Sequence, residues 1–472
     1  MTGRQLRIGV PEPTSPPEID LHGRPVAIFG MARSGMALTE FLVRKGAVPT
    51  VFDEAPAERL TDAMARLGAL PVRLIPGAHS YEQLSNPELV VTSPAVPVQH
   101  PLLQAARASG ATVIGEVELA YRFCPAPIIA VTGTNGKGTT VTLLGDMLNR
   151  AGVRAAVGGN IGIPLISLLD STPAPQVIVA EISSFQLETI DQFRPWIGIL
   201  LNISPDHGDR HPDLEQYLAT KCRLFARQSD DDIAILNADD NRVAAVASRL
   251  DAQVLKVSLA DTTAHGRTEN GTLMVELPGH GPVHLCRSDE LTVPGRHHMR
   301  NTLFAAVAAA TCGASSDDIS AAIRDFSTPR HLMEDAGAVR GVRFINDSKA
   351  TNPAAAIADL SSIQGPLILI AGGHAKSVDL SEYADVAAER ARHIVLIGES
   401  AATLASAIAD RCPVTIATSM EEAVQKAFEV ANSGDTVLMA PGCASYDMFD
   451  GMAARGDAFC REVKRLASRL SP

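Results

Sequence analysis

Short runs of β-branched and other apolar residues alternate with helical stretches along the whole chain. The segment RPVAIFGMARSGMALTEFLVRKG, residues 24–46, contains an apolar strand, a glycine turn and an amphipathic helix. PTVFDE at 49–54, ELVVTSPAVP at 88–97 and ATVIGE at 111–116 add further strands. Because strands that alternate with helices form mostly parallel sheets, the pattern predicts an α/β fold that begins with a Rossmann-like unit.

Two further units of the same kind follow. The second contains IIAVTGTNGKGTTVTLLGDML (128–148), QVIVAEISSFQLE (176–188), PWIGILLNISPDHGDRH (195–211) and DIAILNADD (232–240). Glycine turns between about Val254 and Leu291 predict an antiparallel excursion, and the helix RNTLFAAVAAATCG (300–313) closes this unit. The third contains VRFINDSKATNPAA (342–355), PLILIAGGHAKS (366–377), HIVLIGES (393–400) and DTVLMAPGCASYDMF (435–449).

The chain of 472 residues is too long for one hydrophobic core, and its length suggests about three domains. We expect a poorly ordered lead-in at residues 1–22 and an N-terminal Rossmann-like domain at 23–115. A central α/β domain like those of P-loop ATPases is expected at 116–328, and a C-terminal Rossmann-like domain at 329–472.

The composition indicates the class of partner and the compartment. A net charge of -12 argues against a nucleic-acid or anionic-membrane partner, which would require a basic surface. Seven dispersed cysteines without a CxxC pair indicate reduced thiols rather than disulfides or a zinc site. The N-terminus lacks the apolar core of a signal peptide, and no apolar run approaches the roughly 20 residues of a membrane span. We therefore expect a soluble, cytoplasmic, multidomain protein. We also expect it to act as a monomer.

The segment TGTNGKGTT, residues 132–140, has the residues of a phosphate-binding loop. Backbone N–H groups of a glycine-rich turn at a helix N-terminus bind anionic oxygens, and Lys137 adds a mobile positive charge for β- and γ-phosphates. Thr139 or Thr140 would offer a hydroxyl to Mg²⁺. The usual P-loop glycine, five residues before the Gly-Lys pair, is replaced by Val131. The alternative is a structural turn with a solvated lysine.

Three other residues are candidates for chemistry. Glu181 follows an apolar strand, where a carboxylate would face the phosphate crevice, and His207 lies in a loop after another strand. Lys221 lies in YLATKCRLF, a helical stretch whose other face is apolar. Each also has an ordinary interpretation. Glu181 would stabilise a helix N-terminus, His207 would bond within its loop, and Lys221 would extend along apolar surface into water.

Several stretches together resemble the Mur ligases of peptidoglycan synthesis, most closely the members that add D-glutamate. They are VTGTNGKGTT, VGGNIGIPL, EISSFQLE, NISPDHGDRH, YLATKCRLF, FINDSKATNP, GGHAKS, CASYDMF and RGDAF, and the similarity extends from about Pro25 to Leu466. The resemblance implies three domains that bind a UDP-sugar, ATP and an amino acid, in that order. It also implies that ATP phosphorylates the carboxylate of UDP-N-acetylmuramoyl-L-alanine, after which the amine of D-glutamate attacks the acyl phosphate.

The resemblance also implies roles for individual residues. Lys137 and two Mg²⁺ ions would neutralise the transferring phosphoryl group, with Glu181, His207, Thr139 and a carbamylated Lys221 as metal ligands. A carbamate suits that position because a free ammonium would be repelled by two dications. The ATP contacts would be Gly133, Thr134, Asn135, Gly136, Lys137, Gly138, Thr139, Thr140, Asn301 at the adenine and Asp347 at the ribose. The contacts to the other substrates would be Arg33, Ser34, Asp53, Ser93, Asn160, Ser183 and Gln186 for the UDP-sugar, and Lys349, Thr351, Lys376, Ser445 and Tyr446 for D-glutamate.

Three positions depart from the D-glutamate pattern. Gly138 replaces the usual Ser or Thr after Lys137, and Leu332 replaces an arginine for which Arg330 would substitute. Met452 replaces an aromatic residue near the amino-acid pocket, which leaves L-glutamate as an alternative substrate. The GKG form is shared with folylpolyglutamate synthases, which leaves a ligase of that type as a second alternative. A sister Mur ligase, a dinucleotide oxidoreductase built on GMARSG and Asp53, and a non-catalytic nucleotide-binding scaffold are the remaining ones.

Overall fold

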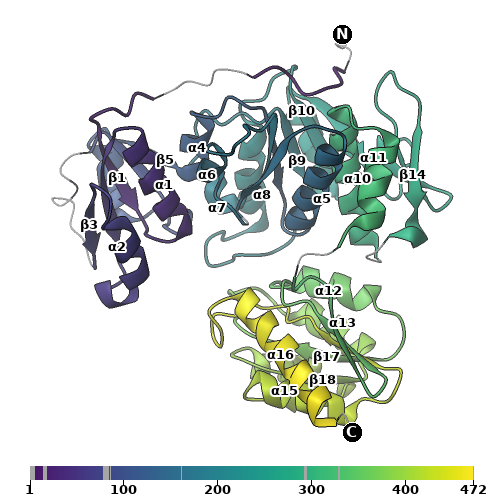
Figure 1. Cartoon of the computed structure of the whole chain (residues 1–472). Coiled ribbons are helices and arrows are strands. Elements are labelled where there is room, and N and C mark those ends of the chain that lie inside the picture. The colour runs from purple at the N-terminus through teal and green to yellow at the C-terminus, as the bar shows by residue number, and fades with distance from the viewer. Residues whose placement is uncertain are drawn as a thin grey trace. The chain divides into compact units, whose positions relative to one another are not determined.

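The computed structural model describes residues 6–13, 19–77, 84, 87–160, 162–291, 295–327 and 330–470. The chain forms two compact units. The first comprises Met1–Ile203, Glu215–Ser288 and Arg300–Arg324, and the second comprises Ser204–Leu214, Asp289–Met299 and Asp325–Pro472. The first unit contains two sheets and the second contains one, so the predicted three α/β domains are present (Figure 1). The predicted boundary at 328/329 and parts of the lead-in, 1–5 and 14–18, lie outside the described residues.

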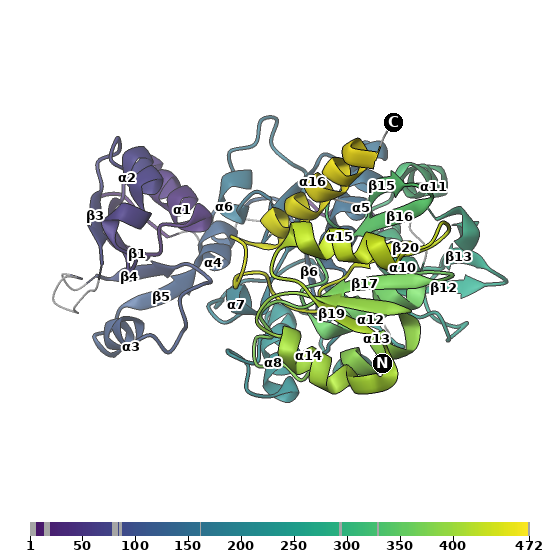
Figure 2. The same ribbon diagram turned by 90° about the horizontal axis from the view of Figure 1, so that it is seen from below.

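The N-terminal sheet has the Rossmann order β3-β2-β1-β4-β5, with all neighbouring strands parallel. Its strands are β1 Pro25–Phe29, β2 Val48–Asp53, β3 Arg73–Pro76, β4 Leu89–Thr92 and β5 Thr112–Gly115. Helices α1 Arg33–Arg44 and α2 Thr61–Leu67 cover one face, and α3 Pro101–Ala108 covers the other (Figure 2). The strand order reverses between β1 and β4, where ligands of such sheets bind. Arg33, Asp53 and Ser93 lie at this carboxyl edge.

The central sheet has nine strands in the order β14-β13-β12-β11-β10-β9-β6-β8-β7. They are β6 Ile128–Thr132, β7 Ala155–Gly159, β8 Val177–Glu181, β9 Ile197–Leu200, β10 Ile233–Asn237, β11 Gln253–Val257, β12 Gly266–Glu269, β13 Thr272–Val275 and β14 Val283–Arg287. The predicted antiparallel excursion is present but begins later than Val254. The strand β11 pairs parallel with β10, because Val254, Leu255 and Val257 continue the apolar pattern of the sheet. The antiparallel pairing starts only between β12 and β13.

The helices of this region include the one that follows the phosphate loop. They are α4 Glu116–Tyr121, α5 Lys137–Arg150, α6 Leu165–Leu168, α7 Ser184–Leu187, α8 Leu214–Cys222, α9 Asn241–Val246, α10 Arg296–Thr311 and α11 Ser316–Asp325. The helix predicted at 300–313 is confirmed as α10, which begins one turn earlier. It therefore starts in the second unit and continues in the first.

The C-terminal sheet has the order β15-β16-β20-β17-β18-β19. Its strands are β15 Glu334–Val339, β16 Val342–Asn346, β17 Leu367–Ala371, β18 His393–Leu396, β19 Val414–Ile416 and β20 Thr436–Met439. The antiparallel edge strand β15 is absent from the sequence prediction, because EDAGAV contains only one buried apolar residue, Val339. An edge strand that faces water needs little apolar character.

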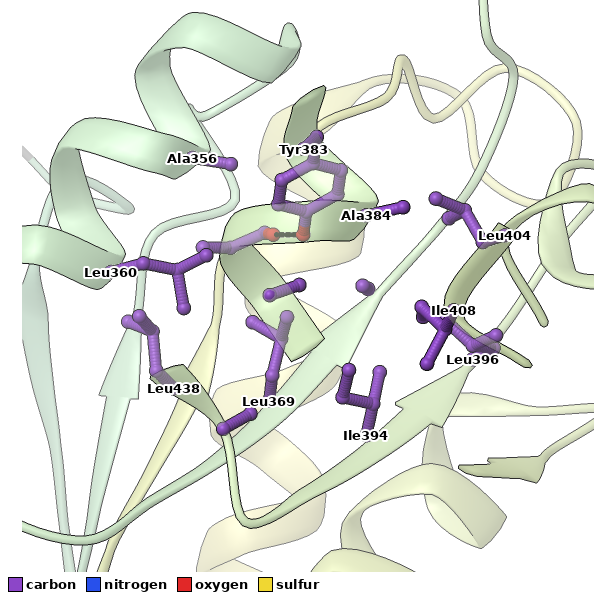
Figure 3. Close-up of a cluster of buried hydrophobic side chains, with 14 of the residues drawn as sticks. Ala356, Leu360, Leu369, Tyr383, Ala384, Ile394, Leu396, Leu404, Ile408 and Leu438 are labelled. Atoms are coloured by element: carbon purple, nitrogen blue, oxygen red, sulfur yellow. Dashed lines mark hydrogen bonds between the residues drawn. The ribbon is translucent and has the colours of Figure 1, made fainter. Parts of the chain in front are cut away.

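Helices cover both faces of the C-terminal sheet. The helices α12 Pro353–Ser362, α13 Ser381–Arg390 and α14 Ala401–Ile408 pack on one face, and α15 Met420–Val430 and α16 Met452–Leu470 pack on the other. Leu360, Tyr383 and Leu404 fill the first face over Leu369 and Ile394 (Figure 3). The tyrosine hydroxyl donates to the carbonyl oxygen of Ala440, so this buried polar group is satisfied. Among the described residues, no helix is both long enough and apolar enough to cross a membrane.

Candidate active site

The loop between β6 and α5 has the backbone form of an anion cradle. Strand β6 ends at Thr132, and α5 begins at Lys137. Gly133 and Gly136 have φ angles of +146° and +87°, a region that other residues rarely adopt. The first N–H groups of α5 therefore follow a tight turn at the carboxyl edge of the sheet, and the helix dipole adds positive potential there.

Asn202, which the sequence prediction did not single out, holds this loop. Its backbone carbonyl accepts the Thr134 N–H at 3.1 Å, and its side-chain oxygen accepts the Asn135 N–H at 2.9 Å. The side-chain amide donates to the Asn135 carbonyl oxygen at 2.9 Å. Its position just after β9, inside the segment NISPDH, was the available signal, because residues at the carboxyl ends of neighbouring parallel strands converge.

Two lysines donate to one carbonyl oxygen of the loop. Lys137 Nζ lies 2.9 Å from the Gly133 carbonyl oxygen and 2.8 Å from that of Thr134. Lys221 Nζ, from α8, also lies 2.9 Å from the Gly133 oxygen and 4.4 Å from the centre of the Tyr217 ring. Only 1% of Lys221 is exposed, so its amine does not extend into water. A buried amine beside a second ammonium is electrostatically costly, which favours binding of anions at this point.

Glu181, the last residue of β8, has one carboxylate oxygen that is hydrogen-bonded and one that is free to bind a cation. It is buried, and Oε1 accepts a hydrogen bond from the Asn160 side chain at 3.0 Å. Oε2 is buried and has no hydrogen-bond partner within the described part of the chain. An unsatisfied buried carboxylate oxygen is destabilising unless a cation or a donor binds to it. This residue therefore fits a divalent metal ion better than a structural helix acid.

The hydroxyl groups of the α5 first turn differ in their partners. Thr140 donates to the Gly136 carbonyl oxygen at 3.0 Å, a bond within the helix turn. This leaves Thr139, which is also buried, as the better candidate for a metal. Among the described residues, no three His, Cys, Asp or Glu side chains form a metal cluster. The predicted ligand set does not require one, because a hydroxyl and a carbamate would complete it.

His207 and Lys376 both belong to the second unit, where they meet at Asp206. Asp206 Oδ1 accepts from Lys376 Nζ at 3.0 Å, and Oδ2 accepts from the Asn352 amide at 3.1 Å. Burial would raise the pKa of this carboxyl, but Lys376 and His207 outweigh it and hold the pKa below its ordinary value. His207 itself has a φ of +53°. The predicted glutamate-binding ammonium thus holds a carboxylate of the protein.

The other predicted amino-acid contacts lie in the loops around β16 and β20. Lys349 and Thr351 follow β16, and the Lys349 N–H donates to the His331 carbonyl oxygen at 3.0 Å. Ser445 is 2% exposed whereas Tyr446 is 76% exposed, so the two neighbours face different surroundings. A cavity of about 350 Å³ adjoins Lys376 and is also lined by His374, Glu399 and Thr403.

The predicted UDP-sugar contacts fall into two groups. Asp53 accepts backbone N–H groups with both carboxylate oxygens, from Met31 at 2.7 Å and Ala55 at 2.9 Å, so it stabilises the glycine turn after β1. Ser93 follows β4, and its N–H donates to the Phe29 carbonyl oxygen. Arg33, next to Ser34 at the start of α1, reaches the Asn160 carbonyl oxygen at 3.5 Å and so joins the N-terminal and central sheets.

Ser183 and Gln186 form a capping box at the start of α7. The serine hydroxyl accepts the Gln186 N–H at 3.3 Å, and the glutamine Oε1 accepts the Ser183 N–H at 2.9 Å. This arrangement satisfies two helix-end donors, so both residues have a structural role. Their predicted contact with substrate remains a prediction.

Three families match the chain in sequence order. They are described as Mur ligase MurD-like, N-terminal domain (residues 24–115), Mur ligase middle domain (131–309) and Mur ligase, glutamate ligase domain (333–443). A protein of Pelotomaculum thermopropionicum, named UDP-N-acetylmuramoylalanine--D-glutamate ligase, is 43% identical over 93% of this chain and 97% of its own. A protein of the same name from Alkaliphilus oremlandii is 38% identical over 95% and 100%. The chain belongs to the Mur ligase family.

Solved Mur ligases share the fold. A pseudomurein peptide ligase type C from Methanothermus fervidus has a TM-score of 0.61 at 19% identity, over 94% of this chain and 100% of its own. MurF ligase from Thermotoga maritima, solved in complex with ADP, has a TM-score of 0.60 at 14% identity, over 96% and 100%. At these identities the likeness concerns the fold alone. Mur ligases depend on ATP and typically use Mg²⁺, which agrees with the loop and with the unsatisfied oxygen of Glu181.

In this Mur ligase, Arg330 pairs with Asp457 on α16, and its Nε atom lies 4.0 Å from Glu334 Oε1. Its side chain is largely exposed. The proposal that it replaces the arginine missing at Leu332 would require it to leave these acids. Met452 begins α16, and its carbonyl oxygen accepts the Ser348 hydroxyl at 2.7 Å. Its backbone therefore supports the loop after β16, whichever amino acid is selected.

Arg455 organises the same loop and was not identified in the sequence. Its guanidinium is 1% exposed and donates to the Ser348 hydroxyl (3.0 Å), the Ser348 carbonyl oxygen (2.9 Å) and the Cys443 carbonyl oxygen (3.0 Å). Burial lowers its pKa to about 10, so it stays charged at neutral pH. The signal was faint: RGDAF is one turn of an amphipathic helix, and nothing in it distinguishes a buried arginine from an exposed one.

Replacing Arg455 with methionine should lower the free energy of unfolding by about 3 kcal/mol, because several buried acceptors lose a charged donor. Urea denaturation would measure this change. Arg461→Met is the matched control, since Arg461 lies on the same helix, is mostly exposed and pairs with its neighbour Glu462 at the surface. Equal midpoints for the two variants would contradict the role given to Arg455.

Replacing Gly136 with alanine should raise the KM for ATP about tenfold or more, because its Cβ would lie 2.4 Å from Asn301 Oδ1 and strain the loop. Gly152 is a matched control at the other end of α5. It has a similar φ of +77°, but a methyl group added there would meet nothing within 4 Å. Gly152→Ala therefore carries the backbone strain without the clash, and steady-state kinetics should show a near-normal KM. A shared defect would mean that Asn301 does not matter here.

Proposed function

We propose that this chain is a UDP-N-acetylmuramoyl-L-alanine:D-glutamate ligase of peptidoglycan precursor synthesis. The observation that carries this proposal is the agreement of relatives of that name, 36–43% identical, over nearly the full chain. It acts as an ATP-dependent carboxylate–amine ligase, in the cytoplasm and as a monomer. The domain boundaries we propose are 23–115 for the UDP-sugar, 116–328 for ATP and 329–472 for the amino acid.

The reaction needs activation of a poor acyl donor. The carboxylate of the muramoyl-alanine takes the γ-phosphoryl group of ATP, which forms an acyl phosphate and ADP. The amine of D-glutamate then attacks the acyl carbon, and the tetrahedral intermediate collapses to an amide with loss of phosphate and a proton. Such a reaction depends on alignment and charge neutralisation more than on a protein nucleophile.

In this proposal the phosphate loop binds the phosphates of ATP. Backbone N–H groups from Gly133 to Thr140 hold the phosphates, and Lys137 exchanges its two loop carbonyls for phosphate oxygens. Asn301, which lies against Gly136, binds the adenine. Asp347, directly after β16, binds the ribose.

Four residues would hold Mg²⁺: Thr139, Glu181, His207 and Lys221 as a carbamate. The unsatisfied oxygen of Glu181 and the burial of Lys221 beside the Gly133 carbonyl support this set. When bound, Mg²⁺ supplies positive charge to the phosphoryl oxygens. Lys221 is buried on α8, and its Nζ atom lies 2.9 Å from the Gly133 carbonyl oxygen, beside the phosphate loop where the carbamate would meet the metal.

The remaining contacts are assigned by position. The UDP-sugar is bound by Arg33, Ser34, Asp53, Ser93, Asn160, Ser183 and Gln186, and D-glutamate by Lys349, Thr351, Lys376, Ser445 and Tyr446. Lys376 is paired with Asp206, so it would have to exchange or share this carboxylate to bind one from a dicarboxylic substrate.

The test is phosphate release and amide formation with UDP-N-acetylmuramoyl-L-alanine, ATP and one amino acid at a time. D-Glutamate should support turnover, whereas L-glutamate, L-alanine and diaminopimelate should not. Mass spectrometry should find the D-glutamyl amide. Turnover with L-glutamate instead would establish the alternative selectivity raised by Met452. Phosphate release without the UDP-sugar would overturn the proposal.

A further inference from the structure

Two buried carboxyl groups of the second unit lie next to each other. Asp347 directly follows β16, and Asp359 lies on α12. Their side chains are within hydrogen-bonding reach of each other. In the described part of the chain, the buried Oδ2 atom of each carboxyl has no hydrogen-bond partner outside the pair.

A proton shared between the two carboxyl groups would stabilise this buried pair. Two ionised carboxylates in contact repel, but one proton between them forms a short, strong hydrogen bond and satisfies both groups. Burial raises the pKa of both carboxyls, that of Asp347 to about 7 and that of Asp359 well above its ordinary value. The hydrogen bond between them raises the pKa of Asp359 and lowers that of Asp347, so Asp359 is the donor and Asp347 the acceptor.

The surroundings agree with that assignment. Lys349 and the Arg455 guanidinium both act on Asp347, and their positive charges favour its ionised form. The negative charge of Asp359 acts on Tyr383, and the Asp359 Oδ1 atom lies 4.0 Å from His297 Nε2, which is beyond hydrogen-bonding distance. The Asp347 Oδ1 atom also accepts the Ala350 N–H at 3.1 Å.

We infer that Asp359 is a positioning residue for ATP, whose protonated carboxyl fixes the orientation of the Asp347 carboxylate toward the ribose hydroxyls. This inference rests on the proposed function, in which Asp347 binds the ribose. A carboxylate free to rotate in a buried site would lose part of its interaction with two adjacent hydroxyls. A donor on α12 prevents that rotation and leaves acceptor positions for the sugar.

The experiment measures KM for ATP and kcat from pH 6 to pH 10 in three variants. Asp359→Ala removes the donor, so KM for ATP should rise about tenfold at pH 7.5 while kcat changes less than twofold. Asp359→Asn keeps an N–H donor, so its KM should stay near that of the wild type. Asp385→Asn, a change at an exposed side chain that pairs with Arg411, is the control and should change neither.

The pH profile separates positioning from packing. In the wild type, KM should rise at alkaline pH, where the pair loses its last proton and the two carboxylates repel. Asp359→Asn cannot lose that proton and should lack the alkaline rise, a readout that serves if the alanine variant fails to fold. An unchanged profile in Asp359→Asn, or an equal KM in the asparagine and alanine variants, would overturn the inference. Asp347→Asn tests the ribose assignment itself: if its KM for ATP is normal, the proposed function of Asp347 fails instead.

Discussion

Replacing Lys137 with alanine is expected to lower kcat for D-glutamate-dependent phosphate release about 10³-fold. The Lys137 ammonium lies 2.9 Å from the carbonyl oxygen of Gly133 and 2.8 Å from that of Thr134, both in the phosphate loop. Those carbonyls are weak partners for a cation compared with phosphate oxygens, so ATP should draw the ammonium away from them. The charge that develops as the γ-phosphoryl group transfers would then lack its nearest mobile counter-charge.

The comparison with Lys137→Arg sharpens this prediction. A guanidinium keeps the charge but is a planar fork, and it does not fit the two carbonyls that hold the compact ammonium. We expect arginine to restore ATP binding more than turnover. Lys426→Ala is the control, because Lys426 pairs with Glu422 on the surface helix α15 and should leave the rates unchanged. A Lys137→Ala variant with normal kcat in a rapid-quench assay would exclude the lysine from phosphoryl transfer.

Local sequence patterns were sufficient to predict the α/β architecture. Strand, turn and helix periodicity predicted the Rossmann-like first domain, the phosphate loop and α10, because each depends on residues close together in the sequence. The prediction was wrong about where the antiparallel pairing begins, since glycine turns show that the chain reverses but not which strand pairs first; β11 still pairs parallel with β10, and the antiparallel pairing starts between β12 and β13. The edge strand β15 was missed because it faces water on one side and carries little apolar pattern.

The long-range polar contacts of the site could not be predicted from the sequence. Asn202 acts on the phosphate loop from 67 positions away, and Arg455 acts on Ser348 from 107. Neither contact has a periodicity, because a hydrogen bond between distant loops depends on the whole fold. The same holds for Asp206, whose ion pair with Lys376 spans 170 positions. Residue types at the carboxyl ends of strands indicate where such contacts converge but not which ones form.

Lys221 is the residue whose surroundings the structure defines most clearly beyond the sequence. Its sequence context left open an ordinary lysine extended into water, whereas the structure buries its amine against the carbonyl oxygen of Gly133 and over the ring of Tyr217. In the proposed modification the amine would attack CO₂, forming an N–C bond and releasing a proton, and the product would be an anionic oxygen ligand.

Replacing Lys221 with alanine should therefore abolish most turnover, with a loss of about 10³-fold or more in kcat. Removal of CO₂ from wild-type enzyme should lower its rate, and bicarbonate should restore it, whereas the alanine variant should not respond. Lys221→Arg tests charge against carbamate, because an arginine keeps a cation at the Gly133 carbonyl but does not form the modified group.

The carbamate and a purely structural lysine differ in what each variant does. If the amine only ties α8 to the loop, Lys221→Arg should keep much of the activity and the wild-type rate should not depend on CO₂. If the carbamate is the active form, Lys221→Arg should be as inactive as the alanine variant despite an unchanged melting temperature. ¹³CO₂ should then give a carbamate carbon signal in the wild-type enzyme that is absent from both variants. A CO₂-independent wild-type rate together with an active arginine variant would exclude the modification and leave Glu181 to hold the cation with neutral partners.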